Sequence, residues 1–278
     1  MSTLREDFLR TSKLPHIWCP GCGNGIVTGA LVRAIDRVGY EQEDVSVVSG
    51  IGCSSRAAGY MNFNTLHTTH GRALAFATGL KFAHPQLKVF VIMGDGDATA
   101  IGGNHFIHAA RRNIDLNAII INNHIYGMTG GQHSPLTPEG KRATTAPRGT
   151  QERSFDILDL ARSAGATFGA RVTAAQPRLM ERLIVQGANN RGFSVVEALS
   201  MCPVAYGRRN KQGSPVDMLM DMKDRSVKVD KLAEAEESGD PEGETDGRIP
   251  IGVLFSDPQP EFTDNYYQQA RSLSEQKG

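Results

Sequence analysis

Two of this chain's four cysteines lie close together, in the stretch WCPGCGNG at residues 18–25. The other two stand alone, Cys53 in GIGCSSR and Cys202 in SMCPVA. A C-x₂-C pair with two remote cysteines can supply four thiolates, which suits a closed Cys₄ zinc site or an iron–sulfur cluster. Four unrelated buried thiols are a third interpretation. The cysteines alone slightly favour zinc, whereas their turn-forming contexts offer backbone N–H groups that can hydrogen-bond to cluster sulfur.

A second group of chemistry-bearing residues lies in GDGDATAIGGNHFIHAARRNIDLNAIIINN, residues 94–123. Gly94-Asp95-Gly96 ends one apolar run, and Asn122-Asn123 ends the next. If the two runs are neighbouring parallel strands, Asp95 and Asn123 meet at one sheet edge, where they can offer oxygen ligands to Mg²⁺. The glycines let backbone N–H groups approach a diphosphate at the start of the following helix.

The cysteines and the GDG…NN residues must be positioned by regular elements. Along the chain, short β-branched runs alternate with helical patterns. The sequence predicts strands at 45–50, 88–96, 116–123, 193–200 and 249–257 and helices at 71–83, 102–113, 154–165 and 176–190. Near-continuous Val and Ile content in the strands indicates a sheet covered on both faces. The alternation predicts an α/β fold with an open, mostly parallel sheet flanked by helices, and ligands at the carboxyl ends of its strands.

Two segments depart from this alternation. Residues 125–150 are rich in Gly, Pro and Thr and predict a long irregular loop, a type of segment that is usually functional or disordered. After about residue 203 the pattern weakens, and the acidic stretch 230–250 predicts an exposed loop. The expected organisation is a cofactor-binding domain at 1–210 and a C-terminal extension at 211–278 that packs on this domain or on a partner subunit.

Composition limits the classes of function. The chain has 278 residues with 30 basic and 30 acidic side chains, so bulk attraction gives no argument for nucleic-acid binding. The charged start, MSTLREDFLRTSKLP, lacks the apolar core of a secretory signal, and the aliphatic runs are too short to cross a membrane. We therefore expect a cytoplasmic protein, in which cysteines serve as ligands or catalysts more often than as disulfides.

The GDG…NN pair resembles the diphosphate-binding motif of thiamine diphosphate enzymes. By this resemblance Gly94, Asp95, Gly96 and Asp97 belong to the cofactor site, although Asp97 can instead cap the following helix. The resemblance also implies that Mg²⁺ is held by the side chains of Asp95 and Asn123 and by the carbonyl of Ile125. The same motif implies that a loop wraps the phosphates, and this loop begins with Gly127, Met128 and Thr129.

The residues around the cysteines indicate which family of thiamine diphosphate enzymes the chain resembles. WCPGCGNG, GIGCSSR, LHTTHGRA, GDGDATAIGGNH, NNHIYGMTGGQ and MCPVAYGRRN run in the order found in β subunits of 2-oxoacid:ferredoxin oxidoreductases, most closely the 2-oxoglutarate (KorB-type) form. These segments span 18 to about 210. The resemblance implies that one [4Fe–4S] cluster is bound by four ligands, Cys19, Cys22, Cys53 and Cys202. An electron acceptor beside thiamine diphosphate gives the electrons released by decarboxylation an exit.

The implied reaction is the coenzyme A-dependent oxidative decarboxylation of 2-oxoglutarate to succinyl-CoA and CO₂, with electrons passed to ferredoxin. It can run in reverse as a CO₂-fixing step of a reductive tricarboxylic acid cycle. The resemblance implies a larger α subunit that supplies an activating glutamate and the coenzyme A site, in an αβ or (αβ)₂ assembly. A pyruvate or broad-specificity form, a non-redox thiamine diphosphate enzyme with structural zinc and a non-catalytic Cys₄ zinc module are the alternatives.

Two further side chains are candidates for catalysis. Arg56, three residues after Cys53, can pair with the carboxylate of an oxoacid, or it can be a surface or interface arginine. His70, in THGRA, can donate a proton near neutral pH, or it can satisfy local backbone at the entry to a helix. Trp18, before the first cysteine, either shields a cluster from water or packs in the core.

Overall fold

The computed structural model describes residues 6–238 and 247–276, with the side chains of 233 and 235–238 left aside. One eight-stranded sheet runs through the fold, in the order β2-β1-β3-β4-β6-β5-β8-β7. Every neighbouring pair of strands is parallel except β5 and β8, which are antiparallel. The predicted mostly parallel α/β sheet is therefore confirmed. The strands are β1 (Val45–Ser49), β2 (Asn64–His67), β3 (Lys88–Gly94), β4 (Asn117–Asn122), β5 (Phe168–Thr173), β6 (Ser194–Leu199), β7 (Ser226–Lys228) and β8 (Ile249–Ser256).

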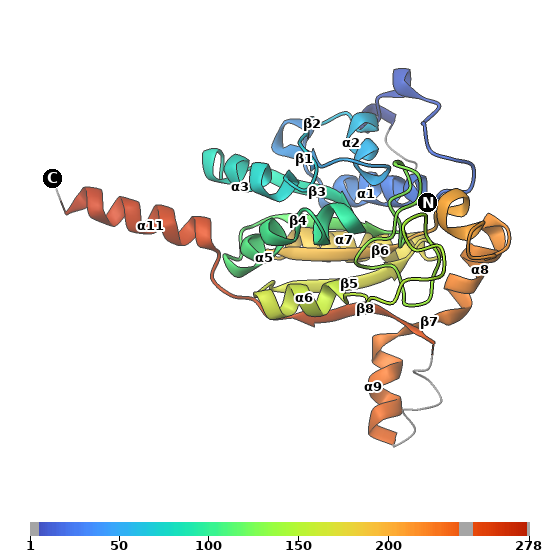
Figure 1. Ribbon diagram of the computed structural model, residues 1–278. Coiled ribbons are helices and arrows are strands. Elements are labelled where there is room, and N and C mark those ends of the chain that lie inside the picture. Colours follow the sequence, from blue (N-terminus) through green and yellow to red (C-terminus); the bar gives the residue numbers. More distant parts are fainter. Residues whose placement is uncertain (1–5, 239–246, 277–278) are drawn as a thin grey trace.

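Helices cover both faces of this sheet (Figure 1). The side chains of Phe90 and Ile92 pack with α1, α2 and α7, whereas those of Val89 and Val91 pack with α3, α5 and α6. This alternation explains why the central strands are apolar at every position. The helices are α1 (Asn24–Val38), α2 (Ala57–Tyr60), α3 (Ala73–Ala83), α4 (Asp95–Thr99), α5 (Gly103–Arg111), α6 (Ile157–Ala164), α7 (Pro177–Asn189), α8 (Pro215–Arg225), α9 (Val229–Ser238) and α11 (Phe262–Glu275).

The elements predicted from periodicity are present with small shifts at their ends. β3 ends at Gly94, and α4 begins at Asp95, so the predicted strand at 88–96 was two residues too long. The loop at 125–150 contains no helix or strand beyond an isolated bridge between Tyr126 and Gln132, as predicted. None of the described helices is both long and apolar enough to cross a membrane.

The prediction of an exposed loop over 230–250 was wrong at both of its ends. Residues 229–238 form α9, and Ile249 begins β8, while 239–246 lie outside the described residues. Glutamate and alanine are good helix formers, so an acidic stretch without periodic apolar residues can still be helical. The returning strand predicted at 249–257 is confirmed as β8.

The region after residue 210 joins the main sheet through β7 and β8, and its last helix, α11, projects beyond the sheet in Figure 1. The base of α11 is fixed to the body of the protein. The Tyr267 hydroxyl donates to the Phe82 carbonyl at 2.5 Å, and Arg191 pairs with Asp264 at 2.5 Å. The same Arg191 also reaches the buried carboxylate of Asp115 at 2.8 Å.

A buried ion pair beneath this contact gives a test of the fold. The Lys81 ammonium lies 2.6 Å from Asp115, and the two side chains are only 1% and 8% exposed. Asp115→Asn leaves Lys81 buried without its counter-charge, and we expect a loss of about 3–5 kcal/mol in the free energy of unfolding. Asp264→Asn breaks the half-exposed pair with Arg191 and should cost less than about 1 kcal/mol. Urea denaturation of both variants measures the difference, and equal losses would contradict this assignment.

Candidate functional site

The carboxyl ends of β3 and β4 bring the two halves of the GDG…NN motif together. Gly94 pairs with Ile121 in the parallel register, so the residues after each strand emerge side by side. A narrow cleft at this edge contains His70 and every residue that the sequence assigned to the cofactor. Its lining consists of Ile51, Gly52, Cys53, Ser54, His70, Gly94, Asp95, Gly96, Asp97, Asn123, Ile125, Tyr126, Gly127, Met128 and Thr129.

Asp95 is a buried acid of the cleft, with 3% of its surface exposed. Its carboxylate accepts a hydrogen bond of 2.5 Å from the Ser134 hydroxyl, and burial raises the pKa of this carboxyl to about 7. Buried carboxylates are costly unless they are paired or coordinate a metal. The sequence reasoning did not find Ser134, because the serine lies in the irregular loop and its contact depends on the tertiary fold.

The oxygen donors near Asp95 suit a hard cation. Asn123 is 7% exposed, and within the described residues its amide oxygen accepts one bond, a long 3.3 Å bond from the Ile125 N–H. A carboxylate oxygen, an amide oxygen and a backbone carbonyl form the kind of donor set that Mg²⁺ takes, together with phosphate oxygens of a bound cofactor. The residues present therefore fit the magnesium diphosphate that the motif implies.

Glycines allow two close approaches at this edge. A Cβ at Gly96 would clash with the Tyr126 ring, whose hydroxyl donates to the Gly96 carbonyl at 3.0 Å. A Cβ at Gly127 would lie 3.4 Å from the Cys202 sulfur and 3.6 Å from the Cys53 sulfur. Gly127 thus stands where the diphosphate cleft and the thiols meet.

Asp97 does not cap a helix, so that alternative for this residue was wrong. It lies inside α4, and neither α4 nor α5 begins with a side-chain cap. One carboxylate oxygen accepts a very short bond from His70 Nδ1 and a 2.7 Å bond from the Gly71 N–H. The other oxygen is buried and has no hydrogen-bond partner among the described residues. Asp97 therefore orients the His70 ring at the mouth of the cleft.

The four cysteines gather from three separate turns. Cys19 and Cys22 precede α1, Cys53 precedes the 3₁₀ turn Ser54–Arg56, and Cys202 precedes the π-helical turn Pro203–Gly207. Burial, with a smaller contribution from the charges of the other three sulfurs, raises the pKa of Cys22 to about 11. Burial and the sulfurs of Cys202 and Cys19 also raise the pKa of Cys53, so these thiols lie in one neighbourhood.

Two kinds of metal centre hold four thiolates at different spacings. In the part of the chain that the structure describes, no three His, Cys, Asp or Glu side chains are arranged around a single metal ion. A closed zinc site places four ligands at about 2.3 Å from one point. Thiolates bound to an iron–sulfur cluster surround a larger inorganic core.

Trp18 and Arg56 flank this neighbourhood. The Trp18 indole donates to the Cys53 carbonyl at 2.7 Å and packs against His16 and Tyr60, so it covers the turn that carries Cys53. Arg56 is exposed and does not line the cleft, but its charge opposes the rise in the Cys53 pKa that burial causes.

Comparison with known proteins agrees with this geometry. Residues 50–198 match the family model described as the thiamine pyrophosphate enzyme, C-terminal TPP binding domain. A 2-oxoglutarate synthase subunit KorB of Methanothermobacter marburgensis is 52% identical over 94% of this chain and 90% of its own length. The Archaeoglobus fulgidus KorB subunit is 55% identical over 82% of this chain and 83% of its own.

A solved structure gives the same result at the level of the fold. The 2-oxoglutarate:ferredoxin oxidoreductase from Magnetococcus marinus, with 2-oxoglutarate, coenzyme A and succinyl-CoA bound, superposes with a TM-score of 0.86 at 30% identity. The match covers 98% of this chain and 91% of that one. The chain therefore belongs to the KorB family, the β subunits of 2-oxoglutarate synthases, which are built on the thiamine pyrophosphate-binding domain.

Proposed function

We propose that this chain is the cofactor-binding β subunit of a 2-oxoglutarate:ferredoxin oxidoreductase. The reaction converts 2-oxoglutarate and coenzyme A to succinyl-CoA and CO₂ and passes two electrons, one at a time, to ferredoxin. The observation that carries the proposal is the meeting of the Asp95–Asn123 cleft and the thiols of Cys53 and Cys202 at Gly127. Bound thiamine diphosphate supplies the carbanion chemistry of the decarboxylation, and the cluster accepts the electrons.

The residues of this chain hold the cofactors and exclude water. Asp95, Asn123 and the Ile125 carbonyl would hold Mg²⁺, with Ser134 fixing the Asp95 carboxylate. Backbone N–H groups around Gly94–Asp97 and the loop Gly127–Thr129 would hold the diphosphate. The [4Fe–4S] cluster would be bound by four thiolates, Cys19, Cys22, Cys53 and Cys202. Such thiols need a reducing compartment, which favours the cytoplasm.

The size of the cleft supports a second subunit. Its cavity is about 80 Å³, far below the roughly 300–1,000 Å³ of pockets that enclose a ligand. We therefore infer that the cofactor is sandwiched between this chain and an α subunit, which contributes the activating glutamate and binds coenzyme A. An αβ or (αβ)₂ assembly satisfies this geometry.

Activity measurements test the whole proposal. The anaerobically purified αβ complex should reduce viologen with 2-oxoglutarate and coenzyme A, and the β chain alone should not, because its cleft lacks the opposing wall. A panel that includes pyruvate measures substrate preference. Turnover by the single chain would contradict the shared site, and a preference for pyruvate would favour the broader-specificity form.

Two variants distinguish the thiol site from the thiamine diphosphate site. Cys202→Ser should lose iron and the visible absorbance that dithionite bleaches, while it still binds thiamine diphosphate. Asp95→Asn should keep its iron and visible absorbance but lose binding of thiamine diphosphate, because the oxygen donors and the thiols are different sets of side chains. Iron and zinc analysis, absorbance spectra and equilibrium dialysis with thiamine diphosphate measure these effects in the complex. Stoichiometric zinc without iron would defeat the redox function.

His70 and Arg56 should affect different kinetic constants. We propose that His70, oriented by Asp97, exchanges a proton with the reacting oxygen, and His70→Gln should lower kcat by about 10²–10⁴-fold. Arg56, which we propose attracts the substrate carboxylate, should mainly change KM when replaced by Gln. His105→Gln, outside the cleft, is the matched control. An unchanged kcat in His70→Gln would remove its catalytic role.

A further inference from the structure

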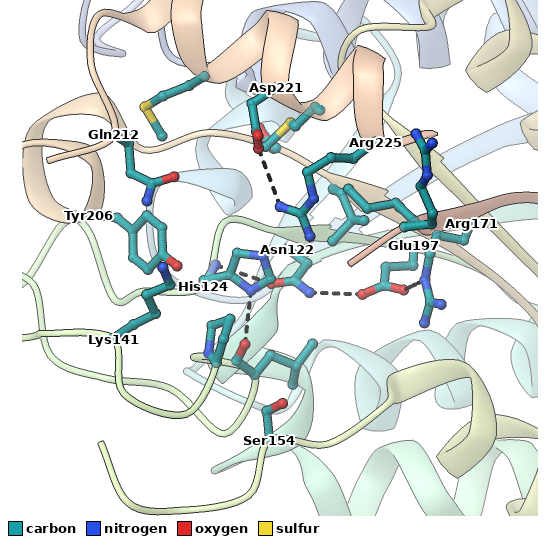
Figure 2. Close-up of a pocket in the computed structure, with 18 of the residues that line it drawn as sticks. Asn122, His124, Lys141, Ser154, Arg171, Glu197, Tyr206, Gln212, Asp221 and Arg225 are labelled. Carbon is teal, nitrogen blue, oxygen red and sulfur yellow. Dashed lines mark hydrogen bonds and ion pairs between the residues drawn. The ribbon is translucent and has the colours of Figure 1, made fainter. Parts of the chain in front are cut away.

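A second and larger cavity, of about 520 Å³, lies beside the end of β4 (Figure 2). Asn122 and His124 line this cavity, whereas Asn123 and Ile125 line the diphosphate cleft. His124 has a left-handed backbone conformation (φ 63°), and this turn directs neighbouring side chains to different sides, so one short segment forms a wall of both spaces. The function proposed above does not use this cavity.

The floor of the cavity is a closed set of polar contacts. Glu197 accepts from Asn122 at 2.8 Å and from the Arg171 Nε at 2.5 Å. Arg171 also pairs with Asp156 at 2.6 Å, and together the two acids hold its pKa above the usual value for arginine against the cost of burial. Both oxygens of Glu197 are therefore engaged, and the floor presents no free carboxylate to a ligand.

The walls, in contrast, present hydrogen-bond donors. Lys141, Arg225 and Arg248 line the cavity, and among the described residues of its lining Asp221 is the one acid besides Glu197. Arg225 is held by the Gly247 carbonyl at 2.7 Å and by Asp221 at 3.3 Å, which leaves part of its guanidinium facing the space. In Figure 2 the Lys141 ammonium, the Gln212 amide and the Arg225 guanidinium point toward the region around His124 and Tyr206.

Arg225 and Arg248 donate to the backbone carbonyls of Gly247 and Asp224, but the other donors have no partner in the described part of the chain. Within 6–238 and 247–276, the Lys141 ammonium, the Gln212 side chain and the Tyr206 hydroxyl donate to no protein atom. Burial raises the pKa of Tyr206 to about 12, so this hydroxyl keeps its proton at neutral pH. Unused donors around a space of this size are the usual signature of a site for acceptor groups.

The remaining surface of the cavity is apolar. Leu199, Met218 and Met222 contribute aliphatic and thioether surface, and the rings of His124 and Tyr206 lie 5.7 Å apart at a tilt of 42°. A ligand that fills the cavity therefore needs an apolar or aromatic body as well as acceptor oxygens. Unbranched methionine side chains adapt to the shape of such a body.

We propose that this cavity binds a small organic anion, with its oxyanion between Lys141 and Arg225 and its apolar body against Tyr206, Met218 and Met222. Charge-assisted bonds from lysine and arginine suit both carboxylate and phosphate oxygens. The volume lies within the range of sites for small molecules. The site is separate from the diphosphate cleft and shares only the wall formed by 122–125.

Three small molecules that share a phenyl ring test the proposal. They are added to the αβ complex saturated with Mg²⁺ and thiamine diphosphate. Benzoate and phenyl phosphate carry the two oxyanions, and benzamide is the neutral analogue of benzoate. Saturation-transfer NMR titration at low salt should show millimolar or tighter binding of at least one anion and much weaker binding of benzamide. The tighter of the two anions identifies the oxyanion that the site prefers.

Variants on one helix give the matched comparison. Arg225→Gln should weaken anion binding by about tenfold or more through the loss of a charge-assisted bond, whereas Lys223→Gln, exposed on the same helix α8, should bind like the parent. Circular dichroism checks that both variants fold. Equal affinity in the two variants, benzamide binding as well as benzoate, or binding by the free chain but not by the complex would each overturn the proposal.

Discussion

The parallel pairing of β3 with β4 is the constraint on which the rest of the site depends. Because Gly94 and Ile121 are partners across the two strands, the chain leaves both at the same height of the sheet edge. Asp95 and Asn123 then face one cleft although two helices separate them in the sequence. The apolar contacts on both faces fix this register, since a shift by one residue would turn the buried side chains to the wrong face.

Close packing around glycine connects the two kinds of cofactor site. Gly127 lies between the cleft and the sulfurs of Cys53 and Cys202, and a Cβ there would contact both sulfurs. The Trp18 indole bonds to the carbonyl of the same Cys53 turn and covers it. Three turns that are distant in the sequence are thereby held around one space, which local propensity alone could not achieve.

The sequence predicted most of the sheet because its central strands are apolar on both faces, and it predicted the cleft because short motifs carry its residues. β5 was missed, since its FGARVT segment contains Arg171, whose burial depends on Glu197 in the next strand. The contacts of Ser134 with Asp95 and of Asp97 with His70 also arise only in the folded chain. Helix α9 was not predicted, because its charged residues resemble those of a loop.

The wall formed by residues 122–125 has a consequence for how this protein can change during evolution. Each of its four side chains faces one compartment or the other, so the stretch has no position that is free of both. His124 has a left-handed backbone (φ 63°), and the side chains of Asn122 and Asn123 accept from the His124 and Ile125 N–H groups at 3.1 and 3.3 Å. Deleting or inserting a single residue here would break this turn and displace the side chains on both sides of the wall. Changes in length are therefore far less tolerable in this segment than in the long loop that follows it.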